Sequence, residues 1–356
     1  MRRLIIYSII ICIYIFFVSC IETKTDTTPV IELYPSPTKS AISLTDKLSE
    51  LTSITKILSI AKDTLLIIDG KNLFVYLVDN SFNPIEKISL KNYDYSFMGG
   101  IKDAIKIKNY LYVVDKSLYF KRYNFISKEL EIIKRDLNLF PLQISNIESV
   151  NDSTFVVSSM VVDYSTTEDS VYNYDSQKKS IKVFKEDNKF RLGALYSYQG
   201  KLKEKFDVPT SDFDHQYPSF DVSFVTQTKG NLYFSFKSAR SLLKYDLNNN
   251  LLKNSTIEVD QKLWIKPHWA KINGREVFVS FSHTRTPLVK YMDDLYYLKF
   301  SKKYLEIFKL DIDLTKKAKY ILKDITSSSW YKFVIVNGRI ILWEEGDTKL
   351  FFYDIK

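Results

Sequence analysis

The chain is poor in cysteine, glycine and histidine: its 356 residues include two cysteines, nine glycines and three histidines. Neither cysteine is placed to pair within a folded domain, which excludes a disulfide scaffold and a cysteine-based zinc site. So few glycines leave no glycine-rich loop to hold a phosphate group. After about residue 20 no apolar run approaches the roughly 20 residues of a spanning helix, which excludes a multi-pass membrane protein.

What the chain does contain is a large apolar fraction. Hydrophobic residues make up 45% of the sequence and aromatic residues 15%, with 26% charged. A disordered chain would be poorer in apolar residues, so this composition predicts a folded core.

The first 20 residues predict export and lipidation. Arg2 and Arg3 precede an apolar run that ends at Ser19 and Cys20. This is the three-part layout of a secretory signal. The stretch 17–20 (Phe-Val-Ser-Cys) resembles the lipobox of bacterial lipoproteins, although Phe17 departs from the usual leucine. We therefore expect a signal peptide over 1–19 and acylation of Cys20. The alternatives are an ordinary signal peptide and an uncleaved single-helix anchor.

The next stretch is rich in threonine and proline. Its composition predicts a flexible tether over 20–39, because it cannot bury a core and its prolines keep it extended. A sorting or docking segment is the alternative interpretation. We expect one folded domain over 40–356.

That domain is expected to be all-β. Runs of Leu, Tyr, Val and Phe recur in pairs, and the second run of a pair ends near an Asp or Asn. The pairs are 64–68 with 73–78, 110–114 with 118–123, 154–157 with 171–174, 232–236 with 242–245, 295–300 with 305–310, and 339–343 with 350–353.

Six such copies, each flanked by further strands, predict a six-bladed β-propeller of four-stranded antiparallel blades. Two β-sandwich domains are the alternative. The predicted blades cover 52–91, 101–137, 144–210, 218–260, 262–324 and 328–356, with insertions around 163–189 and 264–286 in the two long ones. The last blade has room for three strands, so we expect the segment 41–44 to supply the fourth and close the ring.

Enzyme signatures are absent from the sequence, and we assign no catalytic residue, metal ligand or cofactor. There is no Gly-x-Ser-x-Gly elbow, phosphate loop or His-Glu-x-x-His motif. Asp212, Asp214 and His215 are more typical of a solvated loop than of a metal site. Asp311 and Asp313 alternate with apolar residues, which predicts the exposed face of a strand.

A tryptophan-rich segment supplies the candidate ligand-binding residues: Trp264, His268, Trp269 and Arg285. Exposed tryptophans on propeller loops can stack on sugar rings or anchor a partner protein. The structural alternative is that one tryptophan covers the core between two blades.

The formal charge is +9, and it becomes +7 once Arg2 and Arg3 are removed with the signal peptide. Lysine supplies most of the positive charge and is spread through every blade, whereas nucleic-acid binding favours arginine and clustered patches. We therefore expect no nucleic-acid partner.

The lipobox, the tether and the Tyr-rich strands of 231–236 and 243–247 together resemble the TolB-like six-bladed propeller lipoproteins of Bacteroidota. The resemblance implies a lipid anchor in the outer membrane and no agreed activity, with the membrane face left open. It favours a binding or scaffolding module, with a glycan or an envelope protein as possible partner. A glycan-active enzyme, marked by uncompensated acidic residues at the mouth of the ring, and a subunit of an outer-membrane complex are the alternatives.

Overall fold

The structure is a computed structural model, and it describes residues 28–36, 41–97, 99–115, 119–134, 144–162, 191–207, 220–236, 241–256, 268–272, 275–279, 287–300, 304–325 and 331–355. Over those ranges the one helical segment is the 3-10 helix η1 (Lys91–Ser96), and no helix is long and apolar enough to span a bilayer.

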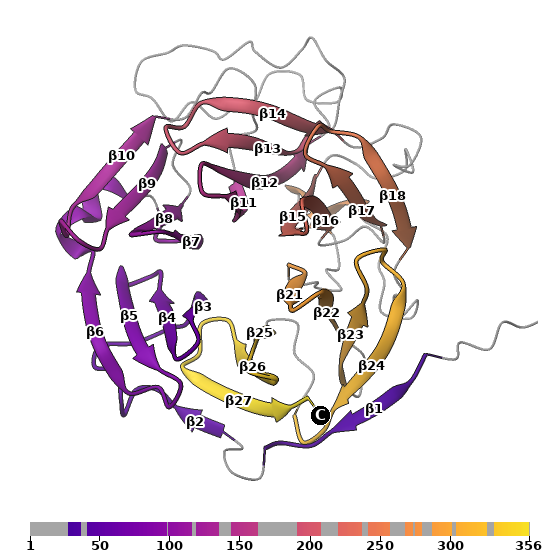
Figure 1. Cartoon of the computed structure of the whole chain (residues 1–356), viewed down its shortest axis with the longest axis horizontal. Coiled ribbons are helices and arrows are strands. Elements are labelled where there is room, and N and C mark those ends of the chain that lie inside the picture. The colour runs from indigo at the N-terminus through magenta and orange to yellow at the C-terminus, as the bar shows by residue number, and fades with distance from the viewer. Residues whose placement is uncertain are drawn as a thin grey trace, which may run out of the picture.

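The described strands form a six-bladed β-propeller, as the sequence predicts (Figure 1). Within each blade the strands follow one another from the channel to the rim. Blades 1 and 2 are built from β3 (Lys56–Ala61), β4 (Thr64–Asp69), β5 (Phe74–Asp79) and β6 (Pro84–Ser89), then β7 (Asp103–Ile107), β8 (Tyr110–Val114), β9 (Tyr119–Asn124) and β10 (Leu130–Lys134).

The next two blades share one continuous sheet, because β12 pairs first with β13 and then, near its end, with β15. Their strands are β11 (Ile144–Asn151), β12 (Thr154–Val162), β13 (Arg191–Ser197) and β14 (Leu202–Asp207), then β15 (Phe220–Thr228), β16 (Asn231–Phe236), β17 (Ser241–Asp246) and β18 (Leu251–Thr256). The sequence predicts that 171–174 is the strand following β12 in this blade, and this prediction is wrong. The strand in that position is β13, and 171–174 lies outside the described residues.

Blade 5 begins after a long connection that holds the separate hairpin β19 (His268–Ile272) and β20 (Arg275–Val279). The last two blades contain β21 (Val289–Tyr291), β22 (Asp294–Phe300), β23 (Leu305–Leu310) and β24 (Lys316–Leu322), then β25 (Tyr331–Val336), β26 (Arg339–Glu344) and β27 (Lys349–Asp354).

The N-terminal segment closes the ring, which confirms the prediction for 41–44. Strand β2 (Ala41–Ser43) pairs antiparallel with β27, and the backbone N–H of Leu44 donates to the Thr348 carbonyl at 3.1 Å. Blade 6 therefore combines an N-terminal strand with the last three strands of the chain, and the outer edge of β27 is paired.

The predicted flexible tether over 20–39 is wrong for the part that the structure describes. Strand β1 (Val30–Leu33) pairs in parallel with β24 and adds a fifth strand to blade 5. Beyond it, Pro35 bridges Tyr353 and the Ser36 N–H donates to the Phe352 carbonyl at 2.8 Å. The segment therefore crosses the rim from blade 5 to blade 6.

The Asp or Asn that ends the third strand of a blade has a local role. The side chain of Asp246 accepts the N–H groups of Asn248 at 2.9 Å and Asn250 at 2.8 Å, which closes the turn around a left-handed Asn249. Asp79 and Asp311 make the same pair of bonds in blades 1 and 5. This turn is the physical reason for the repeated pattern in the sequence.

Each junction between neighbouring blades holds one apolar cluster, so the fold has six cores in place of one. Tyrosines of the strands join the blades across these cores. The Tyr233 hydroxyl donates to the Ile312 carbonyl at 2.8 Å, and the Tyr353 hydroxyl donates to the Lys323 carbonyl at 2.9 Å. The aromatic content of the chain is thus used largely to pack blade against blade.

Candidate functional site

The predicted binding residues fall largely outside the described part of the chain. Cys20, Trp264 and Arg285 lie outside the described residues, as do Asp212, Asp214 and His215. His268 and Trp269 begin β19, where they pair with Val279 and Phe278 of β20. The binding role predicted for this segment stays a prediction.

Asp311 and Asp313 do not share the face of a strand, contrary to the sequence pattern. They lie in the turn after β23, where Asp311 accepts backbone N–H groups and Asp313 pairs with Lys244 at 2.7 Å. The turn residue Leu314, with φ of 59°, breaks the alternation.

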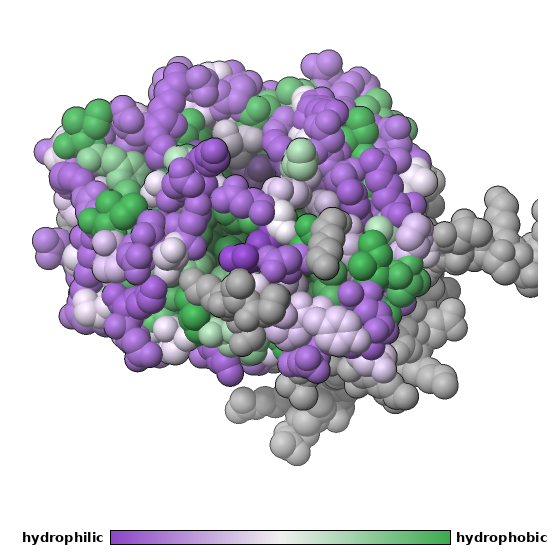
Figure 2. Space-filling model, turned by 60° about the horizontal axis from the view of Figure 1, so that its bottom comes forward, coloured by the Kyte–Doolittle hydropathy of each residue, from purple (hydrophilic) through white to green (hydrophobic). Residues whose placement is uncertain are grey.

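The innermost strands of all six blades surround a central cavity of about 1160 Å³. Figure 1 shows these strands, β3, β7, β11, β15, β21 and β25, around the middle of the ring. Residues just before the innermost strands (Thr55, Lys102 and Pro287) and just after the second strands (Gly70 and Glu345) line the cavity, so it lies toward the face on which the innermost strands begin. Figure 2 shows a hollow near the middle of one face, with hydrophobic residues on its walls and mainly hydrophilic residues around it.

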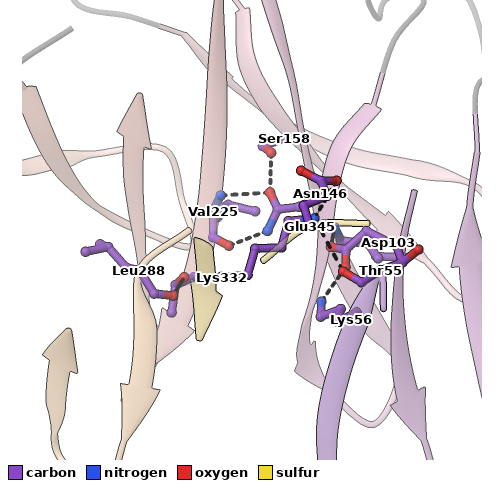
Figure 3. A network of polar contacts seen from close by, with 11 residues as sticks. Thr55, Lys56, Asp103, Asn146, Ser158, Val225, Leu288, Lys332 and Glu345 are labelled. Atoms are coloured by element: carbon purple, nitrogen blue, oxygen red, sulfur yellow. Dashed lines mark hydrogen bonds and ion pairs between the residues drawn. The ribbon is translucent and has the colours of Figure 1, made fainter. Parts of the chain in front are cut away.

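A chain of polar contacts runs around the wall of this cavity (Figure 3). Lys332 of blade 6 donates to the Thr55 carbonyl of blade 1 at 3.3 Å and binds Glu345 at 2.9 Å. Next to Thr55, Lys56 pairs with Asp103 of blade 2 at 2.5 Å. The other carboxylate oxygen of Asp103 accepts the backbone N–H of Ile147 in blade 3 at 2.9 Å.

The contacts continue from blade 3 to blade 5. The Asn146 side chain donates to the Val225 carbonyl at 2.8 Å and accepts the Val225 N–H at 2.9 Å. The hydroxyl of Thr226 then donates to the Leu288 carbonyl at 2.5 Å. Polar contacts at the cavity wall therefore connect neighbouring blades at five of the six junctions. At the remaining junction, between blades 5 and 6, the N-terminal segment connects the two blades at the outer rim.

The cavity wall carries apolar and charged residues on the same blades. Blades 5 and 6 contribute Leu288, Tyr331 and Phe333 but also Lys290, Lys332 and Glu345, and blades 1 and 2 contribute Lys56 and Asp103 together with apolar residues. The lining contains five lysines (Lys56, Lys71, Lys102, Lys290 and Lys332) and four carboxylates (Asp94, Asp103, Glu148 and Glu345). Cations therefore outnumber anions even when every carboxyl group is ionised.

Glu148 is the lining carboxyl group whose pKa is raised. Burial raises the pKa of Glu148 to about 7; Lys56 and Lys290 oppose the rise, Asp103 adds to it, and a hydrogen bond from the backbone of Gln227 opposes it. The side chain is partly accessible because it faces the cavity, but protein surrounds it closely enough to disfavour the charged form. Near neutral pH the group therefore exists in both protonation states.

We expect Glu148→Gln to remove a pH dependence of stability. The pKa of Glu148 is higher in the folded chain than its ordinary value of 4.5, so its contribution is fully present below pH 4.5 and is lost as the pH rises through 7. The variant should match the wild type at pH 4.5 and exceed its unfolding free energy at pH 8 by on the order of 2 kcal/mol. Urea titrations at both pH values measure this, with Glu129→Gln in an exposed turn as control.

No family model matches the chain, and no curated protein matches it. Among solved structures, a Bacteroides thetaiotaomicron protein of unknown function aligns with a TM-score of 0.52 and 11% identity, covering 89% of this chain and 76% of that one. Virginiamycin B lyase from Staphylococcus aureus aligns with a TM-score of 0.51 and 11% identity, covering 89% of this chain and 98% of that one.

Raptor from Chaetomium thermophilum also aligns, at a TM-score of 0.48 and 8% identity; this chain spans 23% of the length of that protein. At these identities the similarity to the propellers above concerns the fold alone. Neither the cavity lining nor an activity is transferred from them.

Proposed function

We propose that the protein is a lipid-anchored binding module whose cavity takes a small amphipathic anion, with an apolar or ring-shaped body and a carboxylate or phosphate group. The observation that carries this is a cavity of about 1160 Å³ that receives residues from all six blades and contains more lysines than carboxylates. Pockets of this size, apolar with a few converging polar groups, are typical of small-molecule sites.

The charge arrangement favours binding over hydrolysis by a pair of carboxylic acids. Asp103 is held by Lys56 and Glu345 by Lys332. The raised pKa of Glu148 would suit a general acid, but these two compensated carboxylates are poorly suited to act as its partner base or nucleophile. Acidic sugars and aromatic acids fit this mixed wall, since it offers lysines together with the aromatic side chains of Tyr331 and Phe333.

Calorimetry with a defined panel tests the ligand class. The panel contains glucuronate, galacturonate oligomers and 4-phenylbutyrate, each beside an uncharged analogue. We expect the anions to bind and the uncharged analogues to bind at least tenfold more weakly, a difference of about 1.4 kcal/mol. Lys290→Ser removes an exposed lining lysine and should weaken anion binding, whereas Lys62→Ser in the β3–β4 turn, outside the cavity, should not. Equal affinity for charged and uncharged members would contradict the proposal.

The anchor is tested separately. We propose that Cys20 is acylated and holds the propeller at the outer membrane, which the lipobox-like 17–20 stretch supports. Cys20→Ser should move the protein from the membrane fraction to the soluble fraction and abolish incorporation of an alkyne-labelled fatty acid. Unchanged fractionation together with retained labelling would contradict acylation at this residue.

A further inference from the structure

The N-terminal strand leaves the ring at its outer rim. Strand β1 is the edge strand of blade 5, so one side of it pairs with β24 and the other faces outward. Figure 1 shows β1 on the outside of the ring, beyond β24 and far from the innermost strands. The described chain begins at Thr28, next to this strand. Any anchor N-terminal to Thr28 is therefore attached at the rim and not at a mouth of the channel.

Exposed apolar side chains gather beside this exit point. Val30, Ile31, Tyr34 and Tyr304 are 59%, 38%, 61% and 39% exposed, and we call them the rim patch. They are four of the eleven large hydrophobic residues exposed in the described ranges, whereas the others are distributed over blades 1, 2, 4 and the β21–β22 turn.

A charged pair connects the two tyrosines of the patch. Lys323 binds Glu32 at 2.8 Å and lies over the ring of Tyr304 at 4.9 Å from its centroid. The hydroxyl of Tyr34 donates to Glu32 at 3.2 Å. Tyrosines and lysines mixed with aliphatic residues are typical of the boundary between lipid headgroups and acyl chains.

The length of the connecting chain restricts how far the patch can be from the lipid. Eight residue steps separate Cys20 from Thr28, and a fully extended chain spans at most about 3.5 Å per residue, or roughly 28 Å. An acylated Cys20 therefore keeps Thr28, next to the rim of blade 5, within roughly 28 Å of the bilayer surface.

We infer that the rim patch lies against the lipid surface, so that the ring stands on its edge and the channel opens to the side. This inference rests on the proposed acylation of Cys20. The exposed backbone edge of β1 limits the depth, because its N–H and C=O groups need water and cannot enter the hydrocarbon. The patch therefore reaches the headgroup level, and ligands enter the cavity without passing between protein and membrane.

Depth-dependent quenching on the full acylated chain tests this. After processing the chain retains only Cys20, which is blocked by its lipid, so Tyr34→Cys and Ile132→Cys each give one reactive thiol. Ile132 is a matched control: it is 53% exposed on β10, the outer strand of blade 2 on the opposite side of the ring. Each variant carries an environment-sensitive dye in phosphatidylethanolamine–phosphatidylglycerol vesicles that contain a headgroup-level spin label.

We expect several-fold stronger quenching at position 34 than at 132. A version with about twenty flexible residues inserted before Thr27 should keep the difference, because the patch and not only the short linker holds the rim at the lipid. Equal quenching at both positions would overturn the inference while leaving the anchor intact, as would a dimer formed through the patch. A wild-type chain that does not associate with vesicles at all would instead overturn the proposed acylation on which the inference rests.

Discussion

Replacing Gly100 with alanine is expected to lower the free energy of unfolding by about 3 kcal/mol or more. The Gly100 φ of +76° lies in the left-handed region, and a Cβ there would lie 2.3 Å from the carbonyl oxygen of Gly70. That same oxygen accepts the N–H of Ile101 at 2.9 Å, which joins blades 1 and 2 at the cavity. Because both contacting groups are backbone, neither can rotate away, and the two blades must separate.

The chain supplies a matched control for this substitution. Gly230 has the same φ of +76°, but a Cβ there would meet nothing within 4 Å. Gly230→Ala should therefore show only the cost of the left-handed backbone, about 1 kcal/mol. Urea denaturation of both variants isolates the steric part as the difference between them. Equal losses would contradict the close approach of blades 1 and 2.

The hairpins of the blades could be predicted from the sequence because their causes are local. A short apolar strand and the Asp that closes the turn after it, as at Asp246, lie within a few residues of one another. Ring closure could also be predicted, since the last blade lacks a strand and the segment 41–44 has no other partner.

Composition misled the interpretation where long-range pairing decides the structure. The Thr/Pro-rich stretch predicts a tether, yet Val30–Leu33 gains ladder hydrogen bonds along β24, almost 290 residues away in the chain. Similarly, β13 pairs with β12 although 28 residues separate the two strands in the chain. The sequence next to β12 therefore does not reveal this partner.

The cavity could not be read from the sequence at all. Its lining comes from short stretches of six blades, and residues such as Thr55 or Ser145 carry no motif. The closest signal is a charged residue at the start of two innermost strands, Lys56 and Asp103, where a buried strand should begin with an apolar one. The tryptophan-rich segment stands out in composition. An unusual local composition does not show which residues from different blades meet at a cavity.

Asn146→Ala is expected to be the other strongly destabilising change. The Asn146 side chain is 5% exposed and replaces a backbone peptide group between blades 3 and 4, since it both donates to and accepts from Val225. It also accepts a hydrogen bond from Ser158, which is fully buried. Alanine leaves three buried polar groups without these partners, and we expect a loss of about 3–4 kcal/mol. Asn254→Ala, at an exposed position of β18, is the surface control.

Asn146→Asp separates loss of the hydrogen bonds from loss of packing. An ionised aspartate still accepts the Val225 N–H, but it places a negative oxygen against the Val225 carbonyl, so its pKa must rise in the folded chain. A raised pKa means that the stability is present at low pH and is lost as the pH increases through the folded value. A protonated aspartate can donate to the carbonyl as asparagine does. Asn146→Asp should therefore recover much of its stability between pH 8 and pH 5, and Asn146→Ala should not; parallel pH responses would show that the amide does not bridge the two strands.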